Sequence, residues 1–144
     1  MATDRSASVV WQGDLQNGSG TIAEVPSGAF GPLDVSWASR AEAPNGKTSP
    51  EELIASAWAS CFAMALAGGL ARGGNPPEKL ETSSTVTFQP GEGITKGVLT
   101  VRGTVPGMDG DAFKEAAEAA KQNCPVSKAL AGISDVTLEA SLAA

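Results

Sequence analysis

The segment spanning residues 53–71 carries no charged side chain, and it constrains the fold more than any other feature of the chain. A membrane span needs about 20 predominantly apolar residues. This segment instead contains two serines and the pair Gly68-Gly69, and alanine outnumbers leucine in it. We therefore expect a helix that is buried on most of its sides inside a soluble protein, and no membrane span.

The residues before this segment form a strong helix start. Ser49 can cap the helix, Pro50 suits its first position, and Glu52 completes a capping box with Ser49. The diproline at residues 76–77 prevents continuation, so the helix is expected to end at Gly68-Gly69 or at Gly73-Gly74.

The surface of this helix predicts a second subunit. An alanine-rich, uncharged surface suits close contact with another helix. One small sheet can cover only one side of such a helix, so a second copy of the chain is expected to cover the rest. The sequence therefore predicts a homodimer.

The remainder of the chain alternates short strands with turns. A second helix is expected to begin at Asp109 or Asp111 and to run to about Asn123, and Pro125 then begins a short helix. Strands are expected over residues 7–11, 20–25, 33–39, 80–88, 94–103 and 135–142. No linker or repeat interrupts the chain, so we expect one α+β domain over residues 1–144, with about six short strands and two main helices.

Composition excludes several classes of function. Ten Lys and Arg face sixteen Asp and Glu, for a net charge of -6, which disfavours nucleic acid and anionic membranes as partners. The chain has no histidine, which removes imidazole catalysis and histidine-bound metals, and its two cysteines cannot alone form a tetrahedral zinc site. No signal-peptide pattern opens the sequence, so a cytoplasmic location is expected.

The two cysteines are the strongest candidates for chemistry. Cys61 lies within the uncharged helix, where a thiol is also at home as an ordinary core residue. Cys124 precedes Pro125 and is expected to cap the short helix, where free amides stabilise a thiolate; the alternative is a structural residue at a kink. Two cysteines in a cytoplasmic protein favour redox use over a structural disulfide.

Without histidine, an arginine is the best candidate to hold a thiolate, since it is always charged and can donate to sulfur and to a peroxide oxygen. Arg40 is expected to end an apolar strand, where its stem can be buried. The other arginines, Arg5, Arg72 and Arg102, each have a simple solvated explanation.

At this point the residues resemble a known family. The sequences Ser49-Pro50-Glu51-Glu52-Leu53, Ala59-Ser60-Cys61-Phe62 and Cys124-Pro125-Val126-Ser127 resemble those of the OsmC/Ohr family, the osmotically inducible and organic hydroperoxide resistance proteins. The likeness covers almost the whole chain. Glu52 and the sequence from Val105 to Asp109 point to the OsmC branch.

The resemblance implies an intertwined homodimer of antiparallel sheets and helices, with active sites at the subunit interface. It assigns Cys61 as the peroxidatic cysteine, Cys124 as the resolving cysteine, Arg40 as the activating arginine and Glu51 as the glutamate that holds it. It also implies reduction of organic hydroperoxides, and more weakly of hydrogen peroxide, in stress defence. The reductant is expected to be a lipoyl-type dithiol or another small thiol, with no bound cofactor or metal.

Helix geometry adds one expectation about this site. Glu51 and Cys61 lie ten residues apart, which is about 15 Å along a helix. We therefore expect Arg40 and Glu51 to serve the Cys61 of the other subunit. Two alternatives stay open for the whole protein: a module that binds a small hydrophobe, and a thiol redox sensor.

Overall fold

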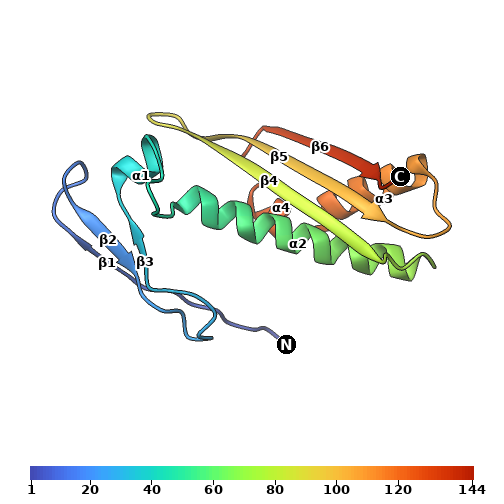
Figure 1. Ribbon diagram of the computed structural model, residues 1–144, viewed down its shortest axis with the longest axis horizontal. Coiled ribbons are helices and arrows are strands. Elements are labelled where there is room, and N and C mark those ends of the chain that lie inside the picture. The colour runs from blue at the N-terminus through green and yellow to red at the C-terminus, as the bar shows by residue number, and fades with distance from the viewer. The chain divides into compact units, whose positions relative to one another are not determined.

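The computed structural model describes all 144 residues and shows the expected α+β class, with two three-stranded sheets (Figure 1). The chain divides into two compact units, residues 1–53 and 54–144, and each is described here by itself. The assignment of all 144 residues to one domain stays a prediction.

The N-terminal unit is an antiparallel sheet of order β1-β2-β3 followed by one short helix, α1. The bounds are β1 Val9–Gln12, β2 Ser19–Ile22, β3 Leu33–Val35 and α1 Trp37–Ala41. The prediction of a strand through residue 39 is therefore wrong beyond Val35. Ser36 and Ser39 form a reciprocal capping box, with N···O distances of 3.1 and 3.0 Å, and this starts a helix where alternating apolar residues had indicated a strand.

The C-terminal unit places helices α2, α3 and α4 with a second sheet of order β4-β5-β6. The elements, of which α2 begins in the N-terminal unit, are α2 Pro50–Arg72, β4 Lys79–Gln89, β5 Gly93–Thr104, α3 Gly110–Asn123, α4 Pro125–Ala129 and β6 Asp135–Leu142. The expectation of antiparallel sheets holds for β4 and β5 but is wrong for β5 and β6, which pair in parallel. Helices α3 and α4 connect these two strands, and such a crossover returns the chain in the same direction.

Helix α2 begins and ends within the predicted limits. The amide of Glu52 donates to Oγ of Ser49 at 3.2 Å, while the Glu52 carboxylate accepts from the Thr48 hydroxyl at 2.7 Å. The helix stops at the second glycine pair, where Gly74 adopts φ +91°. Glycine reaches this left-handed conformation without steric cost, so it ends the helix there.

Helix α2 has the length and apolar composition of a membrane span, but one stripe of it forms the core of the C-terminal unit. Trp58, Phe62, Leu66 and Leu70, spaced four residues apart, are each at most 2% exposed. On the other side Met64 is 75% exposed. The expectation of a helix buried on most of its sides is therefore wrong for the single chain, because α2 packs into the core through one stripe and leaves an apolar face uncovered.

The face of α2 that meets the sheet also carries polar contacts. The hydroxyls of Thr82 and Ser84 on β4 donate to the carbonyls of Ala59 and Ala55, at 3.1 and 2.8 Å. These two carbonyls lie one turn apart on the helix, just before Cys61. Strand β4 therefore fixes the rotation of α2 in the segment that carries the cysteine.

Candidate functional site

An ion pair in the N-terminal unit joins the first two predicted site residues. The Arg40 guanidinium donates from Nε to both carboxylate oxygens of Glu51, at 3.0 and 3.2 Å, and from Nη2 to Oε2 at 2.9 Å. Glu51 is 7% exposed, and the Arg40 side chain is 32% exposed. Such a two-pronged contact fixes the plane of the guanidinium as well as its position.

The local fold explains how these two residues meet. Arg40 lies in the last turn of α1. The sequence analysis had placed it at the end of a strand, and that prediction is wrong. The Ser39 hydroxyl donates to the carbonyl of Thr48 at 3.2 Å, which ties α1 to the residues that precede α2. Because Glu51 lies in the first turn of α2, this short tie brings it to Arg40.

The C-terminal unit brings the two cysteines together as free thiols. Cys61 lies near the middle of α2 and is half-buried, whereas Cys124 lies between α3 and α4 and is fully buried in the core. Each sulfur lies close enough to the other to alter its pKa. Cys61 also packs against the buried cluster to which Cys124 belongs.

The surroundings act in opposite directions on the two thiols. Burial raises the pKa of Cys61, and the neighbouring Cys124 raises it further, while the amide of Val126 works against them. Burial alone would also raise the pKa of Cys124. The amide of Ser127, the thiol of Cys61 and the hydroxyl of Ser127 together outweigh burial and lower it. In the single chain, Cys124 is therefore the thiol that more readily becomes a thiolate.

Helix α4 supplies part of this effect, as the sequence had predicted. Cys124 is its N-cap residue and Pro125 occupies the first helical position. The sulfur accepts no capping hydrogen bond of full geometry. The amides of Val126 and Ser127 nevertheless lie close enough to lower the pKa of Cys124 electrostatically.

Sequence reasoning missed a pair of residues that links the two cysteine-bearing helices. The indole Nε1 of Trp58 donates to Oγ of Ser127 at 2.8 Å, and Trp58 is 1% exposed. Trp58 precedes Cys61 by three residues and Ser127 follows Cys124 by three. That matched spacing, about one helical turn on each side, is the signal that could have identified them.

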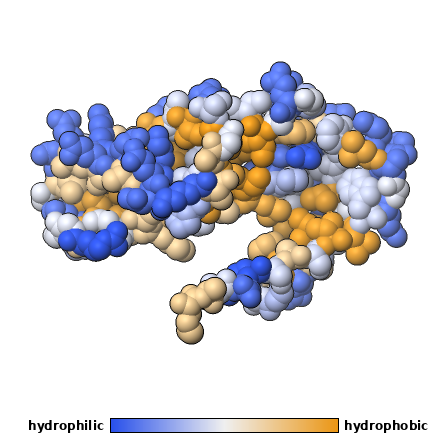
Figure 2. Space-filling model, turned by 180° about the vertical axis from the view of Figure 1, so that it is seen from behind, coloured by the Kyte–Doolittle hydropathy of each residue, from blue (hydrophilic) through white to orange (hydrophobic).

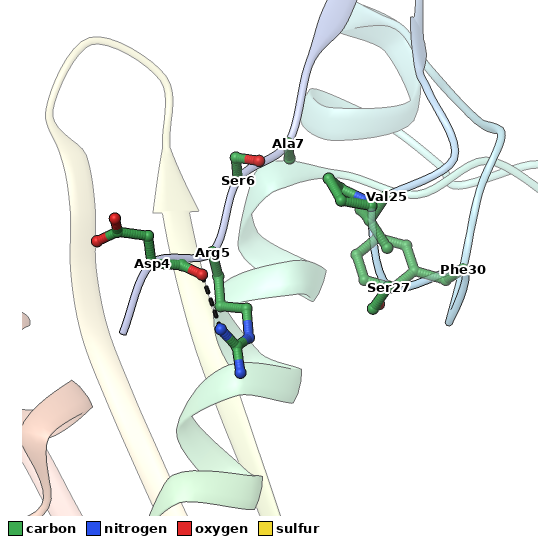
Figure 3. Close-up of a pocket in the computed structure, with 8 residues that line it drawn as sticks. Asp4, Arg5, Ser6, Ala7, Val25, Ser27 and Phe30 are labelled. Carbon is green, nitrogen blue, oxygen red and sulfur yellow. Dashed lines mark hydrogen bonds between the residues drawn. The ribbon is translucent and has the colours of Figure 1, made fainter. Parts of the chain in front are cut away.

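A large cavity lies away from both cysteines. It measures about 730 Å³, belongs to the N-terminal unit, and lies between the N-terminal residues and the loop after β2 (Figure 3). Arg5 is one of the residues that line this cavity, and its guanidinium donates to the carbonyl of Asp4 at 2.7 Å. A smaller cavity of about 300 Å³ borders Trp58 and Ser127, and Lys121 and Lys128 also line it. We place the chemistry at the cysteines because no nucleophilic thiol lines the larger cavity.

Comparison with known proteins identifies the family. The family model described as OsmC-like protein matches residues 43–139. The chain is 34% identical to Peroxiredoxin OsmC of Escherichia coli (strain K12), an alignment that covers 99% of both chains. The chain belongs to the OsmC family. Its similarity to that relative over nearly its full length confirms the OsmC branch.

Other relatives of this OsmC-family chain agree. An organic hydroperoxide resistance protein of Xanthomonas axonopodis pv. citri (strain 306) is 34% identical over 63% of this chain and 65% of that one. The solved structure of an organic hydroperoxide resistance protein OsmC from Legionella pneumophila has a TM-score of 0.68 at 25% identity, covering 94% of this chain and 96% of that chain. An OsmC-like protein from Mycoplasma pneumoniae, at 15% identity and TM-score 0.70 over 99% and 98% of the two chains, shows the same fold.

Proposed function

We propose that this OsmC-family chain is a cysteine-based peroxidase that reduces organic hydroperoxides, and more weakly hydrogen peroxide, to alcohol or water. One observation carries the proposal: a partly buried thiol, Cys61, lies beside a fully buried second thiol, Cys124. The names of the relatives, peroxiredoxin and organic hydroperoxide resistance protein, supply the substrate class.

The reaction uses the two thiols in sequence. The Cys61 thiolate attacks the terminal peroxide oxygen, the O–O bond breaks, and the alkoxide takes up a proton and leaves as the alcohol. Cys61 is then a sulfenic acid. The Cys124 thiolate attacks the Cys61 sulfur and hydroxide leaves as water after protonation, which forms the disulfide. An external dithiol reduces the disulfide and is itself oxidised.

The first step requires a positive group beside Cys61. Burial raises the pKa of this thiol, so a thiolate there needs additional stabilisation. Arg40, held at Nε and Nη2 by Glu51, is the proposed source. Glu51 and Cys61 are ten residues apart on the continuous helix α2, which separates them by about 15 Å along its axis. We therefore assign the Arg40–Glu51 pair to the Cys61 of a second subunit.

A homodimer follows from the same assignment and from the surfaces of the single chain. Met64 and the N-terminal strand residues Val9 and Val10 expose apolar side chains that water does not favour. The protein should show twice the chain mass of 14.5 kDa by light scattering at micromolar concentration. A monomeric mass would contradict both the dimer and the shared site.

The reductant is proposed to be a lipoyl-type dithiol or another small thiol, and the compartment to be the cytoplasm. Two other functions are separated from this one by turnover. A module that only binds a small hydrophobe consumes no hydroperoxide. A redox sensor is oxidised about once per chain, because its partner protein and not excess dithiol completes its cycle.

The test is dithiol-dependent consumption of cumene hydroperoxide by the wild-type protein beside Cys61→Ser. Many turnovers are expected for the wild type and none above the uncatalysed rate for the serine variant, since a hydroxyl does not form a low-pKa nucleophile. Circular dichroism of the variant checks that the fold persists. Appreciable turnover by Cys61→Ser would show that Cys61 is not the attacking residue.

A further inference from the structure

Trp58 and Ser127 join the two chain segments that carry the cysteines. The indole Nε1 of Trp58 donates to Oγ of Ser127 at 2.8 Å, and the indole is 1% exposed. Trp58 lies on α2 three residues before Cys61, and Ser127 lies on α4 three residues after Cys124. One buried hydrogen bond therefore ties the helical turn beside one thiol to the helical turn beside the other.

The sheet holds the Trp58 ring from a second side. Gly97 lies on the central strand β5, and a Cβ built on it would lie 2.5 Å from two carbons of the ring, so the ring packs against bare backbone. The hydroxyls of Thr82 and Ser84 on β4 donate to carbonyls in the same part of α2, at 3.1 and 2.8 Å. The sheet therefore fixes both the rotation of α2 and the direction of the indole N–H.

The backbone of Cys124 is fixed relative to Ser127. The amide of Cys124 donates to the carbonyl of Ala120 at 2.8 Å, and its carbonyl accepts from the amide of Lys128 at 3.1 Å. The first of these bonds closes the end of α3, and the second closes the first turn of α4, which contains Ser127. Because Cys124 and Ser127 belong to one hydrogen-bonded turn, a contact that positions Ser127 also positions Cys124.

The two thiols can form a disulfide only through the packing of these segments. Cys124 is 0% exposed, and Cys61 packs against the hydrophobic cluster that contains both Trp58 and Cys124. A disulfide requires α-carbons within about 7 Å of each other and a narrow range of side-chain directions. A small shift of α4 away from α2 would therefore slow bond formation between the two sulfurs.

We propose that the Trp58–Ser127 hydrogen bond is a clasp that holds Cys124 in place for Cys61, so that the disulfide forms before a second hydroperoxide overoxidises Cys61. This inference rests on the proposed peroxidase function and deepens it. Trp58 and Ser127 are positioning residues in this proposal. They act through the placement of Cys124, and the proposal requires no contact between them and the hydroperoxide.

Two reactions compete for the Cys61 sulfenic acid. In the first, the Cys124 thiolate attacks the Cys61 sulfur, the S–O bond breaks, and hydroxide takes up a proton and leaves as water. In the second, the Cys61 sulfur attacks the terminal oxygen of another hydroperoxide, the O–O bond breaks, and the alkoxide takes up a proton and leaves as the alcohol, which gives the sulfinic acid. Only the first rate depends on the clasp, and only the second on hydroperoxide concentration.

The competition is measured by intact mass after the reduced protein reacts with increasing cumene hydroperoxide in the absence of dithiol. A disulfide removes two hydrogen atoms from the chain, and a sulfinic acid adds two oxygen atoms. For Ser127→Ala and for Trp58→Phe, the hydroperoxide concentration that converts half of the chains to sulfinic acid should fall about tenfold, the effect of one lost buried hydrogen bond. An unchanged concentration in both variants would refute the clasp.

Three further results separate the clasp from general damage to the site. The rate at which Cys61 is first oxidised should stay near that of the wild type. The double variant Ser127→Ala/Trp58→Phe should be no worse than either single variant, because the two residues share one bond. Ser127→Thr keeps the hydroxyl, and the cavity of about 300 Å³ beside Ser127 has room for its methyl group, so it should behave as the wild type does. Additive losses in the double variant, or a threonine variant as impaired as alanine, would contradict the proposal.

The exposed serine of β4 provides the matched control. Ser83→Ala removes a hydroxyl from the solvent-facing side of the strand and should leave the competition unchanged. A shift as large as that of Ser127→Ala would show that the effect does not belong to the clasp.

A last measurement needs no hydroperoxide. At a fixed ratio of oxidised to reduced glutathione, the ratio of disulfide to dithiol in the protein reports how well the fold brings the two thiols together. Ser127→Ala should lower this ratio about tenfold. An unchanged ratio, or no disulfide in the wild type, would overturn the clasp. If the ratio falls as expected but the wild type consumes no hydroperoxide, the proposed function fails and the clasp stands.

Discussion

The two sheets of this protein share a local arrangement but differ in burial. In each, the central strand carries a glycine beneath a tryptophan ring: Gly20 on β2 lies under Trp11, and Gly97 on β5 lies under Trp58. Trp11 is 39% exposed, whereas Trp58 is 1% exposed. Around Trp58 lies a core of large side chains; around Trp11 the strand β1 is exposed along its whole length.

This difference shows that the two units bury their tryptophans to different extents. The C-terminal unit closes its own core and places both thiols at its edge or within it. The N-terminal unit leaves apolar side chains at its surface (Figure 2). It also pairs the buried carboxylate of Glu51 with Arg40, although residues 1–53 contain no cysteine. In the proposed homodimer, a second subunit would cover that apolar surface, and the Arg40–Glu51 ion pair would lie beside its Cys61.

The largest effect is expected within the C-terminal unit. Cys124→Ser should end multiple turnover, because the Cys61 sulfenic acid then has no resolving thiol. The variant should react once with hydroperoxide and proceed to the sulfinic acid. Intact-mass measurement should show one and then two added oxygen atoms on the chain. A Cys61 that stays unmodified in this variant would overturn the assigned order of the two cysteines.

A loss of about a hundredfold in kcat/KM is expected for Arg40→Ala, which removes the charge proposed to stabilise the Cys61 thiolate. Mixing this variant with Cys61→Ser and allowing subunit exchange creates heterodimers. In these, Arg40 of the serine chain meets Cys61 of the alanine chain, so about a quarter of wild-type activity should return at random exchange. If mass measurement confirms exchange and no activity returns, the shared site is wrong.

The paired glycines give a smaller, structural effect. A Cβ on Gly97 would lie 2.5 Å from the Trp58 ring, and that buried ring has no room to retreat. Gly97→Ala should lower the free energy of unfolding by about 1–3 kcal/mol. Gly20→Ala, whose Cβ would lie 2.7 Å from the more exposed Trp11, should cost less because that ring can swing outward. Equal costs in urea denaturation would remove the contrast between the two sheets.

The smallest effect concerns the titration of Cys61. Burial raises the pKa of this thiol in the chain alone, so less thiolate is present at neutral pH and alkylation is slower. In Cys124→Ser, which removes the coupled thiol, the additional change Arg40→Ala should shift the midpoint of iodoacetamide alkylation to higher pH. A midpoint that does not move would show that Arg40 does not act on the Cys61 sulfur.

Much of the fold could be predicted because local patterns and tertiary packing agree. Pro50 and the glycine pair at residues 73–74 bound α2 both in the prediction and in the structure. The alternation of Val136, Leu138 and Ala140 predicted β6 with its observed bounds. The prediction failed at Trp37, whose alternation with Val35 indicated a strand. There the Ser36–Ser39 capping box decided the backbone, and a short helix placed Arg40 beside Glu51.

The sequence by itself determined which residues were available for chemistry: two thiols, no histidine, and a motif around each cysteine that resembles one family. Only the tertiary structure decided which of them meet. It brought Cys61 against Cys124 and aligned β6 parallel to β5 through a helical crossover. It also joined Trp58 to Ser127 across 69 residues of chain. Contacts between distant segments depend on how whole elements pack, and no local pattern encodes that packing.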